Sequence, residues 1–146
     1  MRILAVDFGE VRIGVAVSDP TGTLARPLPF LPAKGNAKLA RDVAALAIKE
    51  QAALVLLGLP RNMDGSFGEA AAKVQAFAEE LRQALGAVPL KLLDERLTTV
   101  QASRQLQESG RNTRAQRGRI DSEAACVLLQ SHLDSQQNFP LLPPDA

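Results

Sequence analysis

Apolar residues alternate with polar or small residues in the first part of the chain, and this period of two is typical of strands. Residues 2–7 form an apolar run that ends in an aspartate, and within residues 11–17 every second residue is apolar. Residues 23–31 fit a third strand. Pro27 and Pro29 place that strand at an edge of the sheet, because proline donates no ladder hydrogen bond. Tight turns join the three strands, which predicts that they are antiparallel.

Further along the chain the apolar residues recur every three or four positions, which indicates amphipathic helices separated by short strands. Ser66 and Glu69 have the spacing of a capping box and predict the start of a helix whose apolar stripe begins with Phe67. In chain order, the expected elements are helix 36–51, strand 53–57, helix 66–85 ended by Gly86, strand 88–94, helix 98–110, an arginine-rich loop 111–119 and a last helix from about Asp121 to Ser135.

The resulting order, βββ-α-β-α-β-α-α, predicts an α/β domain with a mixed five-stranded sheet flanked by helices. The later strands alternate with helices and should be parallel. A Rossmann fold requires a helix directly after the first strand, and the alternation in residues 11–17 contradicts it. We expect one domain over residues 1–136 and a proline-containing tail over residues 137–146.

The composition is that of a globular protein, with 146 residues, 46% hydrophobic and 23% charged. No apolar run reaches the length of a membrane span, and no signal-peptide pattern is present. Cys126 is the single cysteine, which excludes an intrachain disulfide and favours a cytoplasmic protein. Because His132 is the single histidine, a Cys/His zinc site is not expected. We expect Cys126 to pack in the core and His132 to lie at the surface.

The charge is concentrated in one segment, although the whole chain carries only +1. Between residues 96 and 119, six arginines minus the single acid Glu108 give +5. The planar guanidinium suits phosphate groups, whereas a solvated surface is the ordinary explanation of such a charge run. Base stacking on an aromatic platform is not expected, because the chain has no Trp or Tyr and its five Phe are scattered. The six arginines are Arg96, Arg104, Arg111, Arg114, Arg117 and Arg119.

Acidic residues stand at the ends of three predicted elements. Asp7 closes the first strand, Asp94 and Glu95 close the fifth, and Asp121 opens the last helix on its sheet-facing stripe. Neighbouring strand residues point to opposite faces, so only one of Asp94 and Glu95 can join Asp7. A turn aspartate, a polar strand end and a helix N-cap are the structural explanations. Combined, the carboxylates would suit two Mg²⁺ or Mn²⁺ ions, which can activate water for phosphodiester cleavage.

Four segments of the chain carry distinctive motifs: VDFGEVRIGVA at 6–16, GLPRNMDGS at 58–66, DERLTT at 94–99 and IDSEAA at 120–125. In this order they resemble the signature blocks of the YqgF family, also called RuvX. The resemblance implies an RNase H-like fold and a nuclease in which Asp7, Glu95 and Asp121 bind divalent metal. It therefore selects Glu95 over Asp94.

The family resemblance also implies a substrate. The family is associated with maturation of the 5′ end of small-subunit ribosomal RNA, and its likeness to RuvC-type resolvases links it to Holliday junctions. The expected partners are structured RNA or branched DNA and ribosomal precursor particles, but not a membrane, and the protein would be a monomer or a homodimer. The expected nucleic-acid contacts are Arg12, Arg96, Arg111, Arg114, Arg117 and Arg119.

Two other functions stay open at the level of sequence. The arginines suit a nucleic-acid or ribosome-binding factor without catalysis equally well. The Asp-x-Gly of residues 7–9 also resembles a phosphate-binding turn of actin-like ATP-binding proteins, which close two such domains around a nucleotide. Acidic residues in a phosphate-binding cleft weaken binding unless a metal neutralises them, so the three carboxylates favour the nuclease.

Overall fold

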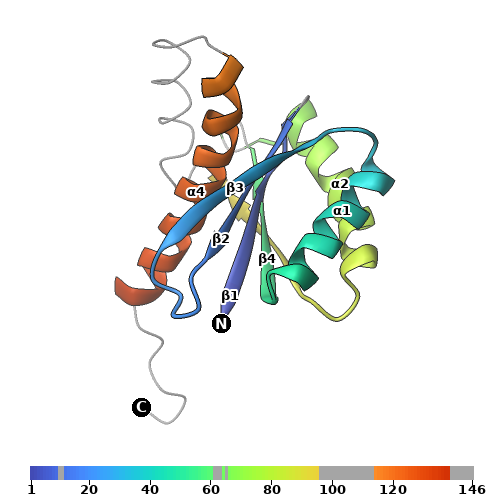
Figure 1. The fold of residues 1–146 in the computed structure, drawn as a ribbon. Coiled ribbons are helices and arrows are strands. Elements are labelled where there is room, and N and C mark those ends of the chain that lie inside the picture. The colour runs from blue at the N-terminus through green and yellow to red at the C-terminus, as the bar shows by residue number, and fades with distance from the viewer. Residues whose placement is uncertain (10–11, 61–63, 65, 96–113, 139–146) are drawn as a thin grey trace.

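A mixed five-stranded sheet forms the centre of the molecule and carries helices on both faces (Figure 1). The computed structural model describes residues 1–9, 12–60, 64, 66–95 and 114–138, with the backbone alone for residues 114–121 and 137–138. The elements are β1 (Arg2–Asp7), β2 (Arg12–Ser18), β3 (Ala25–Pro32), α1 (Asn36–Lys49), β4 (Ala52–Leu59), α2 (Glu69–Leu85), β5 (Leu90–Asp94) and α4 (Arg114–Asn138).

The strand order is β3-β2-β1-β4-β5, which places β1 at the centre of the sheet. The first three strands are antiparallel, whereas β4 runs parallel to β1 and β5 runs parallel to β4. This arrangement confirms the predicted mixed sheet. Pro27 and Pro29 lie in β3, which is an edge strand as predicted. The strands and α1 begin and end within two residues of their predicted bounds.

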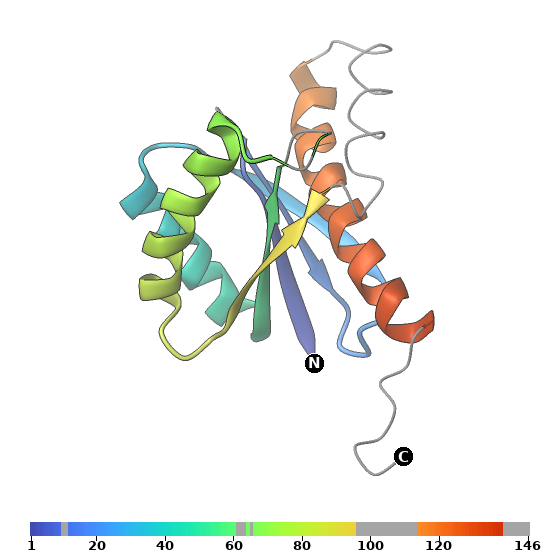
Figure 2. The same ribbon diagram turned by 180° about the vertical axis from the view of Figure 1, so that it is seen from behind.

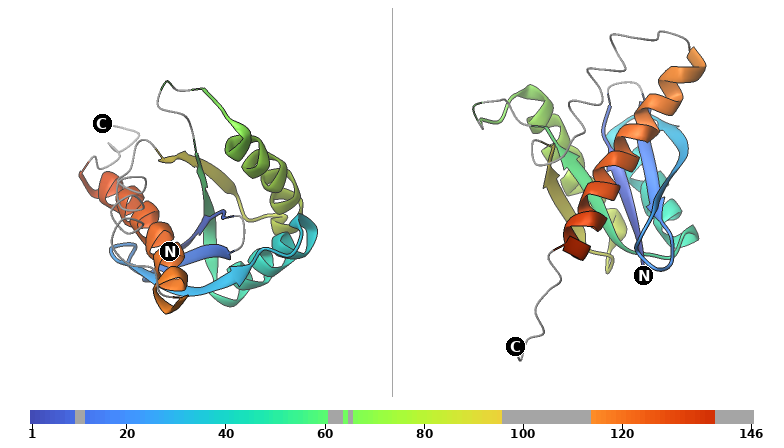
Figure 3. Two further views of the ribbon diagram at one scale, coloured as in Figure 1. Left: turned by 90° about the horizontal axis from the view of Figure 1, so that it is seen from above. Right: turned by 90° about the vertical axis from the view of Figure 1, so that its left-hand side faces the viewer.

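The helices divide unequally between the faces of the sheet. Helices α1 and α2 cover one face, and α4 crosses the other (Figures 2 and 3). Alternation along β1 sends Leu4 and Val6 into the core beneath α1 and α2, and sends Ile3 and Ala5 toward α4. Burying one leucine side chain contributes about 1.5–3 kcal/mol, so both layers hold the sheet firmly. In the part of the chain that the structure describes, every helix is too short or too polar to cross a membrane.

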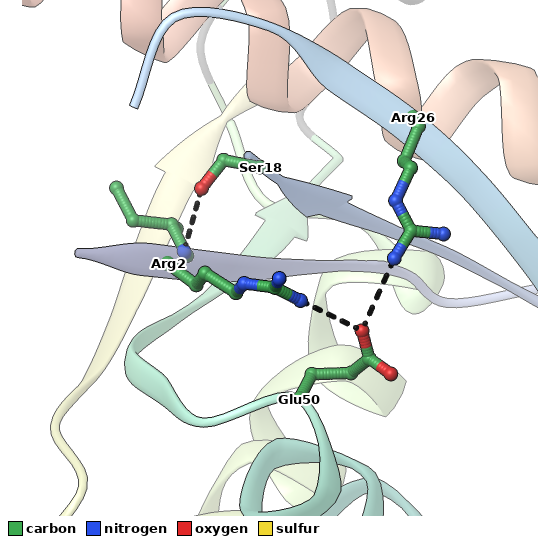
Figure 4. Close-up of polar contacts among 5 residues, drawn as sticks. Arg2, Ser18, Arg26 and Glu50 are labelled. Carbon is green, nitrogen blue, oxygen red and sulfur yellow. Dashed lines mark hydrogen bonds and ion pairs between the residues drawn. The ribbon is translucent and has the colours of Figure 1, made fainter. Parts of the chain in front are cut away.

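Polar contacts join the elements at the end of the sheet where β1 begins (Figure 4). The backbone N–H of Ile3 donates to Oγ of buried Ser18 at 2.8 Å, beside a register shift between β1 and β4. Glu50 follows α1, and its Oε1 lies 3.4 Å from guanidinium nitrogens of both Arg2 and Arg26. These partly exposed ion pairs contribute about 0–1 kcal/mol each, but they connect β1, β3 and the end of α1.

The predicted capping box is wrong. Helix α2 begins at Glu69 after Gly68, and no side chain caps it. Ser66 instead donates from its backbone N–H and its hydroxyl to Oδ1 of Asp64, at 2.9 and 2.6 Å. This local hydrogen bonding competes with the cap and holds the chain outside the helix. Phe67 therefore precedes α2 and is 55% exposed, and it is not part of the buried stripe.

The arginine-rich segment is only partly a loop. Helix α4 begins at Arg114, so residues 114–119 are helical, and Asp121 lies about two turns inside the helix. The N-cap explanation of Asp121 is therefore wrong. Polar residues without apolar spacing gave no periodic signal for these first turns. The helix ends at Asn138, two residues into the predicted tail. The expected helix 98–110 lies outside the described residues, and the domain boundary stays a prediction.

Candidate functional site

Asp7 closes the central strand and is buried, with 4% of its surface exposed. Asp7 pairs with Gly14 of the neighbouring strand β2, and the preceding residue, Val6, pairs with Leu57 of β4. Alternation along β1 places Asp7 on the face of the sheet that α4 covers. The next residue, Phe8, packs on the opposite side against Phe77, with ring centroids 5.1 Å apart. The fold therefore holds a carboxylate in a fixed place at the end of β1.

Glu95 follows β5 directly and is only 2% exposed. A Cβ built on Gly58 of β4 would lie 2.6 Å from Oε1 of Glu95 and 3.2 Å from Cδ2 of Leu128 in α4. Glu95 therefore lies on the α4 face, close against the bare backbone of Gly58. Asp94 pairs with Leu59 of β4, and alternation along the strand places its side chain on the opposite face, which α1 and α2 cover.

Gly58 is the neighbour of both carboxylates in the sheet. Strand β4 lies between β1 and β5, and the pairing of Val6 with Leu57 makes Gly58 the neighbour of Asp7 on the next rung. Asp7 and Glu95 thus share one face of the sheet on either side of β4. Gly58 was not predicted as a site residue, although a glycine in an apolar strand is a known signal of close approach by another group.

Asp121 is on the helix that covers this face. It precedes Ala124, Ala125 and Leu128 by three, four and seven residues, and these three side chains are buried against the sheet. The first turns of α4 lie near the end of the sheet toward which β1 and β4 run (Figure 2). The structure describes only the backbone of Asp121. The described side chains gather no group of three His, Cys, Asp or Glu that could hold a metal ion, and Asp121 as a third ligand stays a prediction.

Arg12 is the one predicted nucleic-acid contact whose side chain the structure describes. It begins β2, and its Cζ lies 5.0 Å from the ring centroid of Phe30 in β3. A side chain at Gly9 would collide with the backbone carbonyl oxygen of Arg12, so the glycine allows the close approach of β1 and β2. Of the other predicted arginines, Arg114, Arg117 and Arg119 lie in the first two turns of α4, and Arg96 and Arg111 lie outside the described residues.

The prediction for His132 is wrong. His132 is 8% exposed, and burial together with the nearby Lys91 lowers its pKa. Its spacing of four and three residues from Leu128 and Leu129 is that of the buried stripe, and this helical spacing is the signal in the sequence for its burial. Cys126 is partly buried as expected, and burial and then Glu123 raise the pKa of its thiol.

The donor chemistry near Asp7 fits a hard cation. Cys126 contacts the backbone carbonyl oxygen of Ala25 at the start of β3, and His132 lies near Lys91 at the start of β5. Ala25 lies at the other end of the sheet, and Lys91 pairs with Leu56 in the middle of β4. The carboxylates of Asp7 and Glu95 offer oxygen ligands, which Mg²⁺ and Mn²⁺ prefer.

Solved structures resemble this fold at low sequence identity. The Thermus thermophilus RuvC in complex with a Holliday junction substrate superposes with a TM-score of 0.63 at 14% identity, covering 94% of this chain and 96% of RuvC. The fowlpox virus Holliday junction resolvase gives 0.53 at 17% identity, covering 92% and 99%. The fold is therefore RNase H-like, of the kind found in RuvC-like resolvases.

Sequence comparison gives the family within this class. The family model described as "RuvX: Holliday junction resolvase" matches residues 1–135. A "Putative pre-16S rRNA nuclease" of Streptomyces avermitilis is 44% identical over 136 residues, covering 93% of this chain and 87% of the relative. One of Thermoanaerobacter pseudethanolicus is 41% identical over 139 residues, covering 94% and 99%. The chain belongs to the RuvX family.

Family membership fixes the class of activity. The protein is a nuclease, which binds nucleic acid and hydrolyses phosphodiester bonds, and divalent-metal dependence is general in such enzymes. This outcome favours the nuclease over a binding factor without catalysis and over an actin-like module.

Proposed function

We propose that this nuclease cleaves precursor 16S ribosomal RNA at its 5′ end. The observation that carries the proposal is the placement of buried Asp7 and Glu95 on one face of the sheet, on either side of Gly58. Two carboxylates held in a dry setting are costly to a fold unless they serve hydrogen bonds or a cation. The relatives that match this chain over nearly its whole length supply the substrate, since they are named for pre-16S rRNA.

Asp7, Glu95 and Asp121 would hold the divalent ions, for which we propose a pair of Mg²⁺ or Mn²⁺. Bound there, such ions supply an activated water and neutralise the charge on the leaving oxygen. The three residues come from three different elements, since Asp7 ends the central strand, Glu95 follows β5 and Asp121 belongs to α4. Arg12 and the arginines of α4 would bind the phosphates of the substrate strand and position it.

The proposed substrate also sets partners and location. Ribosomal precursor particles would be the natural carriers of such an RNA, and the protein would act in the cytoplasm. Cleavage at one end of one RNA strand requires one active site, so a monomer suffices. Paired incisions in a four-way junction would instead require two sites related by symmetry, and hence a homodimer.

Replacing Asp7 by Asn tests the proposal directly. The amide has the same shape, but it lacks the negative charge that holds a divalent ion, so RNA cleavage should fall at least 1,000-fold while the RNA still binds. The assay follows a 5′-labelled RNA spanning the 5′ end of pre-16S rRNA, with Mg²⁺ or Mn²⁺. The matched control is Asp42→Asn, which makes the same chemical change at a partly exposed side chain of α1, where Asp42 pairs with Lys38 at 2.8 Å.

A labelled four-way DNA junction is assayed beside the RNA, because the family model is described as a Holliday junction resolvase. Cutting of the RNA that depends on metal and on Asp7 supports the proposal. Symmetric cutting of the junction without RNA cleavage would replace it with junction resolution. Cleavage by the Asp7→Asn protein at the rate of the Asp42→Asn control would show that the carboxylate of Asp7 is not part of the active site.

A further inference from the structure

The side chain of Arg12 lies on the same face of the sheet as Asp7. Along β2, Ala16 packs toward α4 and Gly14 pairs with Asp7, so alternation puts Arg12 on that face as well. Arg12 is two residues beyond Gly14, or about 7 Å along the strand. Arg12 therefore lies two rungs from Asp7 along the strand axis, and one strand nearer to the β3 edge of the sheet.

The ring of Phe30 holds the guanidinium of Arg12 in that place. The 5.0 Å between Cζ and the ring centroid is within the range of a cation–π contact. Phe30 lies on the edge strand and is 40% exposed, so solvent reaches the ring and the arginine beside it. Among the described residues, no carboxylate forms an ion pair with Arg12. The positive charge of Arg12 is thus held by an aromatic ring and is not neutralised by an acid in this part of the chain.

The contact with Phe30 leaves hydrogen-bonding groups of Arg12 available. A single ring meets only part of a guanidinium, which carries five N–H donors in its plane. Those donors match two oxygens of one phosphate group. A positive group also counters the charge of Asp7 and Glu95, which would repel an approaching phosphate.

We propose that Phe30 and Arg12 form a phosphate-binding subsite on the β3 side of the active site. Phe30 is the positioning residue, and it acts by fixing the guanidinium of Arg12. The subsite rests on the proposed function, because the phosphate that it binds belongs to the substrate RNA strand. That phosphate is the neighbour of the phosphate at which the strand is cleaved. In the alternative explanation, Phe30 only covers the edge of the sheet and does not affect how Arg12 binds phosphate.

The experiment measures RNA binding without cleavage, using the labelled pre-16S fragment in the absence of divalent metal. The variants are Arg12→Ala, Phe30→Leu and the double variant, each measured at several salt concentrations. Arg26→Ala is the matched control, because it removes the same charge from the neighbouring strand at the opposite end of the sheet, where Arg26 faces Glu50. Thermal unfolding of each protein records any change in stability.

Arg12→Ala should weaken binding about tenfold and reduce the salt slope by about one counterion. Phe30→Leu keeps the apolar cover but removes the ring, so binding should weaken about threefold to tenfold. The double variant should bind no more weakly than Arg12→Ala alone, because both changes remove one interaction. Arg26→Ala should bind like the unchanged protein.

Unchanged binding by Phe30→Leu, or losses that add in the double variant, would overturn the subsite. A lower unfolding temperature without weaker binding would do the same and leave Phe30 a structural residue. These results do not depend on cleavage. If the RNA is not cut in the presence of metal but binding follows the expected pattern, the proposed function fails and the phosphate subsite stands.

Discussion

Replacing Gly58 by alanine perturbs the active site through a single methyl group. The new Cβ would lie 2.6 Å from Oε1 of Glu95, whereas ordinary contacts begin at 3.4 Å. Restoring an ordinary 3.4 Å contact moves the carboxylate by about 0.8 Å, the difference between these two distances. A displacement of about 1 Å at a reacting group can reduce the rate about 100-fold, which is about 2.7 kcal/mol of barrier. We expect a fall of that size in kcat.

The same methyl group also approaches α4, at 3.2 Å from Cδ2 of Leu128. Overpacking of this kind costs about 1–3 kcal/mol, which is less than the total stability of a typical domain, so the variant should fold. A second variant, Leu128→Val, removes the Cδ atoms and relieves that contact alone. The double variant Gly58→Ala, Leu128→Val therefore separates the displacement of α4 from the displacement of Glu95.

The assay is steady-state cleavage of the labelled RNA, with a titration of Mg²⁺ and a thermal unfolding curve for each protein. If Glu95 is the affected group, kcat falls in Gly58→Ala and does not return in the double variant, although stability does. Full recovery of kcat in the double variant would show that α4 carried the effect. An unchanged kcat in Gly58→Ala would refute the assignment of Glu95 to the reaction.

Two further predictions concern stability. Phe77 is fully buried and contacts the ring of Phe8, so Phe77→Ala should lower the free energy of unfolding by about 3–5 kcal/mol in urea titrations; a loss below about 1 kcal/mol would contradict this. Hydrogen bonds to Asp19, first from the hydroxyl of Thr21 and then from the backbone of Leu24 and Thr23, lower its pKa from 3.8 to about 2. Ionised Asp19 therefore stabilises the fold above about pH 4, and this contribution disappears as pH falls toward 2. Asp19→Asn should flatten the acid limb of stability against pH, and parallel acid limbs for the two proteins would show that Asp19 contributes nothing.

The sheet could be predicted because its signals are local and redundant. Alternation in residues 11–17 and the prolines of β3 determined the antiparallel half and its edge. The later apolar strands, separated by helices, determined the parallel half. The alternation reflects burial of one face of a strand, and the prolines reflect a missing backbone N–H group. Both features belong to the strand's own residues, so they can be recognised without knowing its distant neighbours.

Helix ends and single polar side chains were predicted less well. Ser66 had two hydrogen-bonding options, a cap for α2 or a turn with Asp64, and the sequence alone did not decide between them. Arg114 begins a helix in a segment without apolar spacing. His132 was expected at the surface because it is polar, although its position relative to Leu128 placed it on the buried stripe.

The residues of the candidate site could be predicted from the sequence only in part. Strand alternation left Asp94 and Glu95 as equal candidates, and the family resemblance chose Glu95. The structure adds a physical reason for considering Glu95, since its carboxylate packs on Gly58 on the face of Asp7. Phe30 gave no sequence signal, because its relation to Arg12 depends on the pairing of β2 with β3.

The position of α4 in the chain has a consequence for the order in which the two faces of the sheet are covered during synthesis. A ribosome makes the five strands before it makes α4. Until then Ile3, Ala5 and Leu56 lack the helix that covers them, and Glu95 lacks the neighbouring Leu128. The face of the sheet that carries Asp7 and Glu95 therefore stays uncovered until α4 has been made and docks on it.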